Sequence, residues 1–368
     1  MTFFNYTSMN GHTGKTFSEL QFECFLTLKK HLMDYLLCAE SSYSPEPADY
    51  WKKIAQMMPN VLSSCDTIDY RDPIMTDSYA ICHLLDRYHR FQLMQEFLLN
   101  QNLTMRKVHK PTDILDVGTG PAPALFAFSD FYNILNEIAG EKKYACRQDY
   151  VEQSSAFRQF LHRFCELPDC AYAVPFHLGS FRDFSDIQFD EKYYEPGKGH
   201  RTRKYRYDMI IFSNFLTSQE GVKKFKKELR EVCRAVRNHG LILVVGASAS
   251  QSQKYRDTYD ACDSVILRPF RNRLFVGNWE KILRHKFVYN YADAYGSELR
   301  EFYQLIQQKI EKFNAPEEIP PKTKDFLTGR IQNTPEKIAE DGWSGVPWDL
   351  SIYQKHSRPA RNSNRSLR

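Results

Sequence analysis

The sequence of 368 residues lacks the segments that direct a protein into a membrane or out of the cell. No apolar run approaches the ~20 residues that a membrane-spanning helix needs. The N-terminal stretch Met-Thr-Phe-Phe-Asn-Tyr-Thr has neither a basic lead nor a hydrophobic core, so we expect no signal peptide and no membrane partner. Nine cysteines, an odd number scattered from Cys24 to Cys262, favour reduced thiols over a disulfide framework. These absences together predict a cytoplasmic protein.

A cluster of metal ligands is lacking as well. Cys165 and Cys170 lie near His162 in the sequence, but no second pair completes a site, so we expect no bound metal. The apolar content of 42% and the aromatic content of 14% instead describe a globular protein with one large domain and an extension or two.

An excess of charge of one sign is confined to the end of the chain. The formal net charge of +5 equals that of the last fourteen residues, which leaves residues 1–354 formally neutral. This distribution weakens the case for a nucleic-acid-binding body and favours a solvated, disordered tail over an RNA-binding arm. The basic residues of this tail are Lys355, Arg358, Arg361, Arg365 and Arg368.

The arrangement of apolar residues divides the chain into a helical part and an α/β part. Apolar side chains recur at helical spacing over residues 17–32 and 81–97, on either side of a break rich in proline and serine. From about residue 112, short apolar strands alternate with helices, which predicts an α/β fold with a parallel sheet. The expected domains are a helical N-terminal cap (1–108), an α/β domain (109–295), a C-terminal extension (296–354) and the basic tail (355–368).

Within the α/β part, Pro121 suits the first position of a helix that Gly140 ends. A second helix is capped by Ser154 or Ser155. The composition of residues 191–206 predicts a mobile loop, residues 238–240 predict a turn, and residues beyond 313 show no clear strand order. The remaining expected strands are 114–117, 149–152, 173–178, 207–212 and 241–245, and the remaining expected helices are 219–238 and 298–313.

The most informative stretch runs from Thr112 to Ala124, where an apolar strand ends in Asp116 and passes through a glycine turn into a helix. Gly118 and Gly120 allow the backbone to turn tightly and to approach a ligand closely. A strand, glycine turn and helix in this order build a nucleotide-sized pocket at the carboxyl edge of a parallel sheet.

Two common nucleotide sites do not fit this stretch. A phosphate-binding loop needs a Gly-Lys-Ser/Thr ending, which is missing after Gly120. A dinucleotide fold places a third glycine where Ala122 stands. The carboxylate of Asp116 would repel a pyrophosphate and attract a ligand that carries an ammonium group.

These residues resemble the first motif of the class I S-adenosylmethionine-dependent methyltransferases, in which an acid precedes Gly-x-Gly. The resemblance continues at the ends of the next three strands, and it implies a Rossmann-like sheet with helices on both faces, S-adenosylmethionine as cofactor and methyl transfer by in-line displacement. The cofactor-binding residues that it implies are Asp116, Gly118, Thr119, Gly120, Pro121, Glu152, Gln153, Ser180, Phe181, Ser213, Asn214 and Phe215.

A purely structural role is also possible for three of the polar residues in this set. Asp116 could cap the following turn, Glu152 could be an ordinary carboxylate at a strand end, and Asn214 could form a turn. His162, His177 and His239 are more often structural than catalytic, so no catalytic residue is assigned.

The acceptor of the methyl group is left open. The phrase Asp-Val-Gly-Thr-Gly-Pro-Ala-Pro-Ala-Leu also resembles the methyltransferase-like assembly proteins of the small mitochondrial ribosomal subunit. Together with the tail, this likeness favours RNA, possibly ribosomal RNA, as the acceptor. The alternatives are a small molecule of the natural-product type and a non-catalytic binding or assembly protein. The oligomeric state is undetermined.

Overall fold

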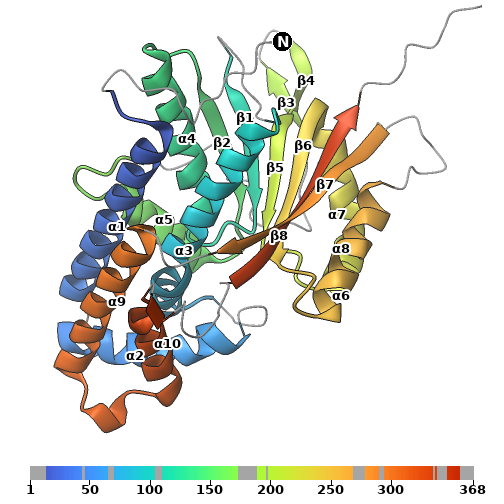
Figure 1. Ribbon diagram of the computed structural model, residues 1–368. Coiled ribbons are helices and arrows are strands. Elements are labelled where there is room, and N and C mark those ends of the chain that lie inside the picture. The colour runs from blue at the N-terminus through green and yellow to red at the C-terminus, as the bar shows by residue number, and fades with distance from the viewer. Residues whose placement is uncertain are drawn as a thin grey trace, which may run out of the picture.

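The computed structural model describes residues 14–43, 46–64, 70–103, 110–172, 189–195, 198–267, 278–289, 294–334, 336–337 and 346–356 (Figure 1). The expected strand 173–178 and the two predicted site residues Ser180 and Phe181 lie outside these residues. No helix in the described ranges is long and apolar enough to cross a bilayer.

A six-stranded sheet forms the centre of the described structure, in the order β2-β1-β5-β6-β8-β7. The first four of these strands are parallel, and β8 runs antiparallel to both of its neighbours. All residues of β1 and β5 are buried, as expected for parallel strands covered on both faces. The strands are β1 (Thr112–Val117), β2 (Cys146–Val151), β5 (Tyr207–Ser213), β6 (Val236–Ala247), β7 (Asn278–Tyr289) and β8 (Val346–His356).

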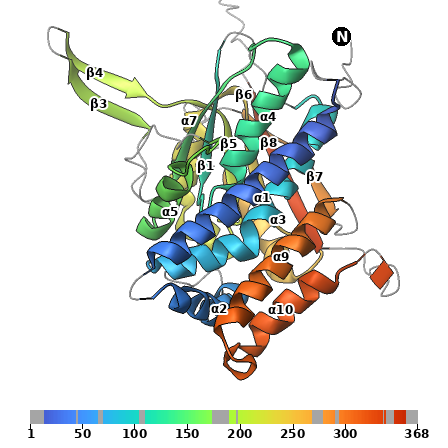
Figure 2. The ribbon, with the colours of Figure 1, turned by 90° about the vertical axis from the view of Figure 1, so that its left-hand side faces the viewer.

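Helices cover both faces of this sheet, which confirms the predicted α/β class (Figure 1). One face carries the N-terminal helices together with α4, α5 and α9, and the other carries α6, α7 and α8 (Figures 1 and 2). The helices of the first face and of the layer outside it are α1 (Phe17–Ser42), α2 (Pro47–Ser64), α3 (Pro73–Asn100), α4 (Pro123–Ala139), α5 (Ser155–Cys165), α9 (Ala294–Phe313), the short 3₁₀ turn η3 (Pro316–Glu318) and α10 (Pro321–Gln332). Those of the second face are α6 (Gln219–Lys224), α7 (Lys226–Ala235) and α8 (Gln253–Ile266).

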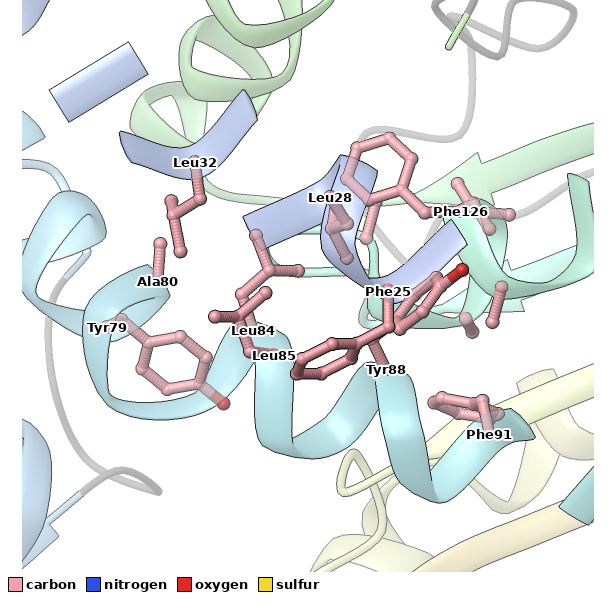
Figure 3. Packing of buried hydrophobic residues seen from close by; sticks show 14 of the residues in the cluster. Phe25, Leu28, Leu32, Tyr79, Ala80, Leu84, Leu85, Tyr88, Phe91 and Phe126 are labelled. Atoms are coloured by element: carbon pink, nitrogen blue, oxygen red, sulfur yellow. The ribbon is translucent and has the colours of Figure 1, made fainter. Parts of the chain in front are cut away.

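The helical N-terminal part and the sheet share one hydrophobic core. Phe25 and Leu28 of α1 pack beside Leu84 and Tyr88 of α3, and Phe126 of α4 closes the same cluster (Figure 3). The cluster continues into buried side chains of β5, β6 and β8. Because burial of apolar surface is the main driving force of folding, we infer that α1 and α3 fold together with the sheet.

Two buried carboxylates tie the helices of this layer together. Asp77 of α3 accepts hydrogen bonds from the hydroxyls of Tyr35 and Tyr50, both at 2.9 Å. Asp130 of α4 accepts from Tyr88 at 2.5 Å and from Tyr172 at 2.8 Å. Burial raises the pKa of Asp77 to about 6 and that of Asp130 to about 7. The tyrosine hydroxyls partly offset this effect because they stabilise the ionised carboxylates.

The start of α4 differs from the prediction. Gly140 ends the helix in a left-handed conformation as expected, with φ of 70°. The helix begins at Pro123, however, because Ala122 is itself left-handed with φ of 63° and cannot lie inside an α-helix. The prediction that Pro121 takes the first helical position is therefore wrong, and Pro123 takes it instead.

The predicted helix 219–238 is shorter and broken, and the predicted turn 238–240 lies inside β6. The register with β5 passes from Tyr207–Val236 to Met209–Leu241, so four β6 residues face a single residue of β5. This bulge holds His239 at φ of 66°. A Cβ at Gly240 would lie 2.6 Å from Val236 and 2.9 Å from the carbonyl of Asp208, which explains why a glycine stands there.

The predicted mobile loop 191–206 is a β-hairpin in the described residues. β3 (Asp190–Glu195) and β4 (Gly199–Lys204) pair antiparallel and project from the body of the molecule (Figure 2). Phe189 lies at the base of the hairpin, buried in the core of the second sheet face. The sequence analysis missed this hairpin because its strands are polar and carry no apolar alternation.

Residues near the end of the sequence form an interior strand of the sheet. β8 inserts between β6 and β7, although the sequence analysis assigned no strand order beyond residue 313. Lys355, counted above as part of a solvated tail, is a buried residue of this strand. Its ammonium donates to the carbonyls of Cys233 at 2.9 Å and of Val236 at 2.7 Å, where α7 ends. The remaining tail residues, 357–368, lie outside the described residues.

We expect Lys355→Met to destabilise the fold, because it removes the donor that satisfies carbonyls at the end of α7. The predicted loss in the free energy of unfolding is about 1–3 kcal/mol, measured by urea denaturation. Lys286→Met, an exposed lysine of the neighbouring strand β7, is the control and should change stability by less than about 0.5 kcal/mol. Equal losses in the two variants would contradict the role assigned to Lys355.

Candidate functional site

The site begins with the turn that follows β1. Gly118 and Gly120 both have positive φ, at 74° and 55°, which only glycine adopts without strain. The N–H groups of Gly118 and Thr119 donate to the carbonyl of Val151 at 2.9 and 3.3 Å, so the turn folds toward the end of β2. Pro121 is buried directly after it. Asp116, Gly118, Thr119, Gly120 and Pro121 therefore lie together at the carboxyl edge of the sheet.

Asp116 is the most unusual group of this edge. Its side chain is 1% exposed, and its Oδ1 atom has no hydrogen-bond partner in the described structure. Burial, together with the nearby charge of Glu152, raises the pKa of this carboxyl to about 7. A buried oxygen without a partner is unfavourable, so the position is suited to a ligand that brings a donor or a positive charge.

Glu152 follows β2 and holds the glycine turn. Its Oε2 accepts the N–H of Gly120 at 2.7 Å, and its Oε1 accepts the N–H of Ser154 at 2.8 Å. Burial raises the pKa of Glu152, and these backbone donors partly lower it again. Gln153 is exposed, and its carbonyl accepts a hydrogen bond from Arg158 at 2.8 Å.

The residues at and after the end of β5 lie on the other side of the glycine turn from β2. Asn214 has a left-handed backbone with φ of 52°, its N–H donates to Val245 at 2.8 Å, and its side-chain amide lies 3.3 Å from the hydroxyl of Ser213. The ring of Phe215 lies against Gly118, since a Cβ placed there would be 2.5 Å from the ring. This contact joins the ends of β1 and β5.

The sequence analysis missed the contribution of α3. Tyr79 lies over Gly120, with its Cε1 3.9 Å from the position that a Cβ would take there. Arg87, two turns later on the same helix, lines a pocket with Asn214 and Tyr259. The spacing of eight residues could have indicated a shared helical face, but the apolar residues around them dominate the pattern of this helix.

The structure thus brings together most of the predicted cofactor-binding residues, and their role stays a prediction. Those at the shared edge are Asp116, Gly118, Thr119, Gly120, Pro121, Glu152, Gln153, Ser213, Asn214 and Phe215, whereas Ser180 and Phe181 lie outside the described residues. Within the described ranges no group of three His, Cys, Asp or Glu side chains is arranged to hold a metal ion.

No protein-family model matches the sequence, and neither does any curated protein. The chain is similar to the solved structure of phosphoethanolamine N-methyltransferase 2 of Haemonchus contortus in complex with S-adenosyl-L-methionine. The identity is 13% and the TM-score 0.38, and the match covers 79% of this chain and 61% of that chain. This chain thus spans about three fifths of that protein's length.

Two further solved structures are similar to the chain. Coclaurine N-methyltransferase bound to N-methylheliamine and SAH has 10% identity and a TM-score of 0.37, over 92% of this chain and 98% of that chain. The cyclase SpnF has 11% identity and a TM-score of 0.38, over 86% of this chain and 97% of that chain. At such identities and TM-scores the likeness carries no argument about activity, so the function must be inferred from this chain's own residues.

We expect Gly118→Ala to destabilise the site strongly, because a Cβ there would meet the base of the Phe215 ring. Gly199→Ala is the matched control: its φ of 73° is almost the same as the 74° of Gly118, but nothing lies within 4 Å of the new Cβ. Both variants should lose about 1 kcal/mol from the positive φ. Gly118→Ala should lose about 1–3 kcal/mol more from overpacking.

Urea denaturation measures both losses. The extra loss of Gly118→Ala should shrink when the same change is made in a Phe215→Ala background, because the ring that it meets is then gone. Equal losses for the two glycines, or no relief in that background, would show that Phe215 does not lie against the turn.

Proposed function

We propose that this chain is an S-adenosylmethionine-dependent methyltransferase whose cofactor lies along the ends of β1, β2 and β5. The observation that carries the proposal is the buried carboxylate of Asp116, one oxygen of which has no partner among the described residues and lies beside two glycines of positive φ. An amino group of the ligand would give that oxygen a charge-assisted hydrogen bond. A pyrophosphate at the same place would be repelled.

Glu152 supports the same ligand. A carboxylate has about four acceptor positions, of which the N–H groups of Gly120 and Ser154 use two. The acceptor positions that backbone donors leave open suit hydroxyls such as those of a ribose. Because β1 and β2 are adjacent parallel strands, Asp116 and Glu152 lie at the same edge of the sheet, where one extended ligand can reach both.

When bound, S-adenosylmethionine supplies a methyl group on a positively charged sulfur. The residues of this chain would then bind the cofactor and orient it toward the acceptor. Asp116 and Glu152 hold the two ends of the cofactor, and Asn214 and Phe215 lie beside the pocket at the end of β5. Tyr79 lies over the glycine turn from α3. Holding the reacting atoms in line is the main contribution that such an enzyme makes.

The acceptor that we propose is a small molecule. The pocket beside Asn214 lies between α3 and α8, and it is lined by Tyr79, Arg87, Tyr255 and Tyr259. Such a concave site with aromatic walls suits a small ligand. The RNA alternative rests on the likeness to the mitochondrial assembly proteins and on the basic tail, and Lys355 of that tail is buried in β8.

We expect the affinity for S-adenosylhomocysteine to fall about tenfold between pH 8 and pH 6, measured by calorimetry. The pKa of Asp116 in the free protein is raised to about 7, so lowering the pH protonates the carboxylate that the ligand's amino group needs. Asp116→Asn should weaken binding about 10- to 100-fold at pH 8 and should make the affinity nearly independent of pH.

Asp130→Asn is the matched control, because Asp130 is also a buried carboxylate with a pKa raised to about 7, but it already has two tyrosine donors. It should leave the affinity within about threefold of the wild type and preserve its pH dependence. Wild-type protein that fails to bind S-adenosylhomocysteine, or an Asp116→Asn variant that binds it normally, would refute the cofactor site.

We expect label to appear in the small-molecule fraction when the protein is added to a cell extract with methyl-labelled S-adenosylmethionine. The extract is separated afterwards into RNA, protein and small molecules, and heat-inactivated protein is the control. Label in RNA would overturn the small-molecule acceptor and support the RNA alternative. No transfer by a protein that binds the cofactor would favour a non-catalytic binding or assembly role.

A further inference from the structure

The guanidinium of Arg87 is held in place beside the proposed cofactor site. One of its nitrogens donates to the hydroxyl of Tyr79, and the group lies over the ring of the same tyrosine, 5.1 Å from its centre. Tyr79 in turn lies over Gly120. The position of Arg87 is therefore coupled to the turn that follows β1.

Arg87 lines a narrow crevice and a neighbouring larger pocket at the ends of β5 and β6. It lines one together with Ser213 and Val245, and the other together with Tyr255 and Tyr259. Asn214 and Gly246 belong to both pockets. A group bound by Arg87 would thus lie next to the residues that follow β5.

The other arginines of this region have carboxylate partners. Arg90 lies 2.8 Å from Asp86, which also has Arg330 at 3.7 Å. Arg284 lies 3.1 Å from Asp349. Among the residues that the structure describes, none offers Arg87 a carboxylate within ion-pair distance. A partly buried guanidinium without a counter-ion is costly, and its planar fork matches a carboxylate or a phosphate.

We propose that Arg87 binds an anionic group, a carboxylate or a phosphate, of the methyl acceptor. This inference rests on the proposed function and narrows its substrate class to small organic anions. The tyrosines around the pocket would contact the apolar body of such a molecule. Its anionic group would accept hydrogen bonds from the guanidinium nitrogens that do not donate to Tyr79. The acceptor is then held at one end, with its nucleophile free to lie near Asn214.

The test uses simple anions on the full chain. Benzoate, its neutral analogue benzamide, and inorganic phosphate are titrated by calorimetry and ligand-observed NMR, with and without saturating S-adenosylhomocysteine. We expect at least one anion to bind about tenfold more tightly than benzamide. Comparing benzoate with phosphate shows which of the two anionic groups the site prefers.

Arg87→Met should weaken the binding of the preferred anion by at least about tenfold and leave the affinity for S-adenosylhomocysteine within about threefold. Arg87→Lys keeps the positive charge but loses the planar guanidinium that can donate two parallel hydrogen bonds. Its affinity for the anion should therefore lie between those of the wild type and of Arg87→Met. Arg256→Met is the control, because Arg256 is an exposed cation next to Tyr255 on the same helix wall. The Arg256→Met variant should bind the preferred anion with the affinity of the wild type.

The outcomes separate this inference from the proposed function. Absence of anion binding, or equal binding by the wild type and both Arg87 variants, would overturn the role of Arg87 while S-adenosylhomocysteine still binds. A parallel loss of S-adenosylhomocysteine affinity in Arg87→Met would also overturn it, since Arg87 would then hold the cofactor. If the wild type binds the anion through Arg87 but not S-adenosylhomocysteine, the anion site stands and the cofactor proposal fails.

Discussion

The hydrogen bond from the N–H of Gly120 to Glu152 connects the turn after β1 with the end of β2, and the candidate site depends on it. It holds the glycine turn in the position where Tyr79 can cover it from α3 and Phe215 can approach it from β5. The turn itself needs glycines, because two of its residues have positive φ and one has an aromatic ring against its Cα. The end of β2, helix α3 and the residues after β5 therefore all meet at the backbone of this turn.

Three of the buried aspartates, Asp77, Asp116 and Asp130, show how burial and function differ. Asp77 and Asp130 each accept two tyrosine hydroxyls, so their carboxylates are satisfied within the protein. Asp116 has an oxygen without a partner in the described structure, and its pKa is raised to about 7. A raised pKa means that this group stabilises the folded state fully below the ordinary pKa of aspartate, and that this contribution is lost as the pH rises through 7. At neutral pH and above, Asp116 is a source of instability that a cationic ligand would relieve.

Much of the fold could be predicted from local patterns, and the exceptions have physical causes. Apolar periodicity indicated the helical N-terminal part and the buried strands β1 and β5. It failed for β8, in which the buried polar residues Asp349 and Lys355 find their partners on other elements. It failed again at residues 238–240, where a bulge inside β6 has the same sequence signals as a turn. The polar hairpin β3–β4 lacked any apolar signal.

The sequence by itself determined the glycine turn and its acid, because only a few residue types permit positive φ and place a charge at the end of a buried strand. Tertiary structure alone decided what surrounds them. Whether Asp116 would be solvated or buried depends on packing, as does the joining of Glu152 to Gly120. The placement of Tyr79 and Arg87 over the same edge follows from how α3 docks on the sheet. Contacts between residues far apart in the chain leave no periodic pattern, so the covering of the site could only be found in three dimensions.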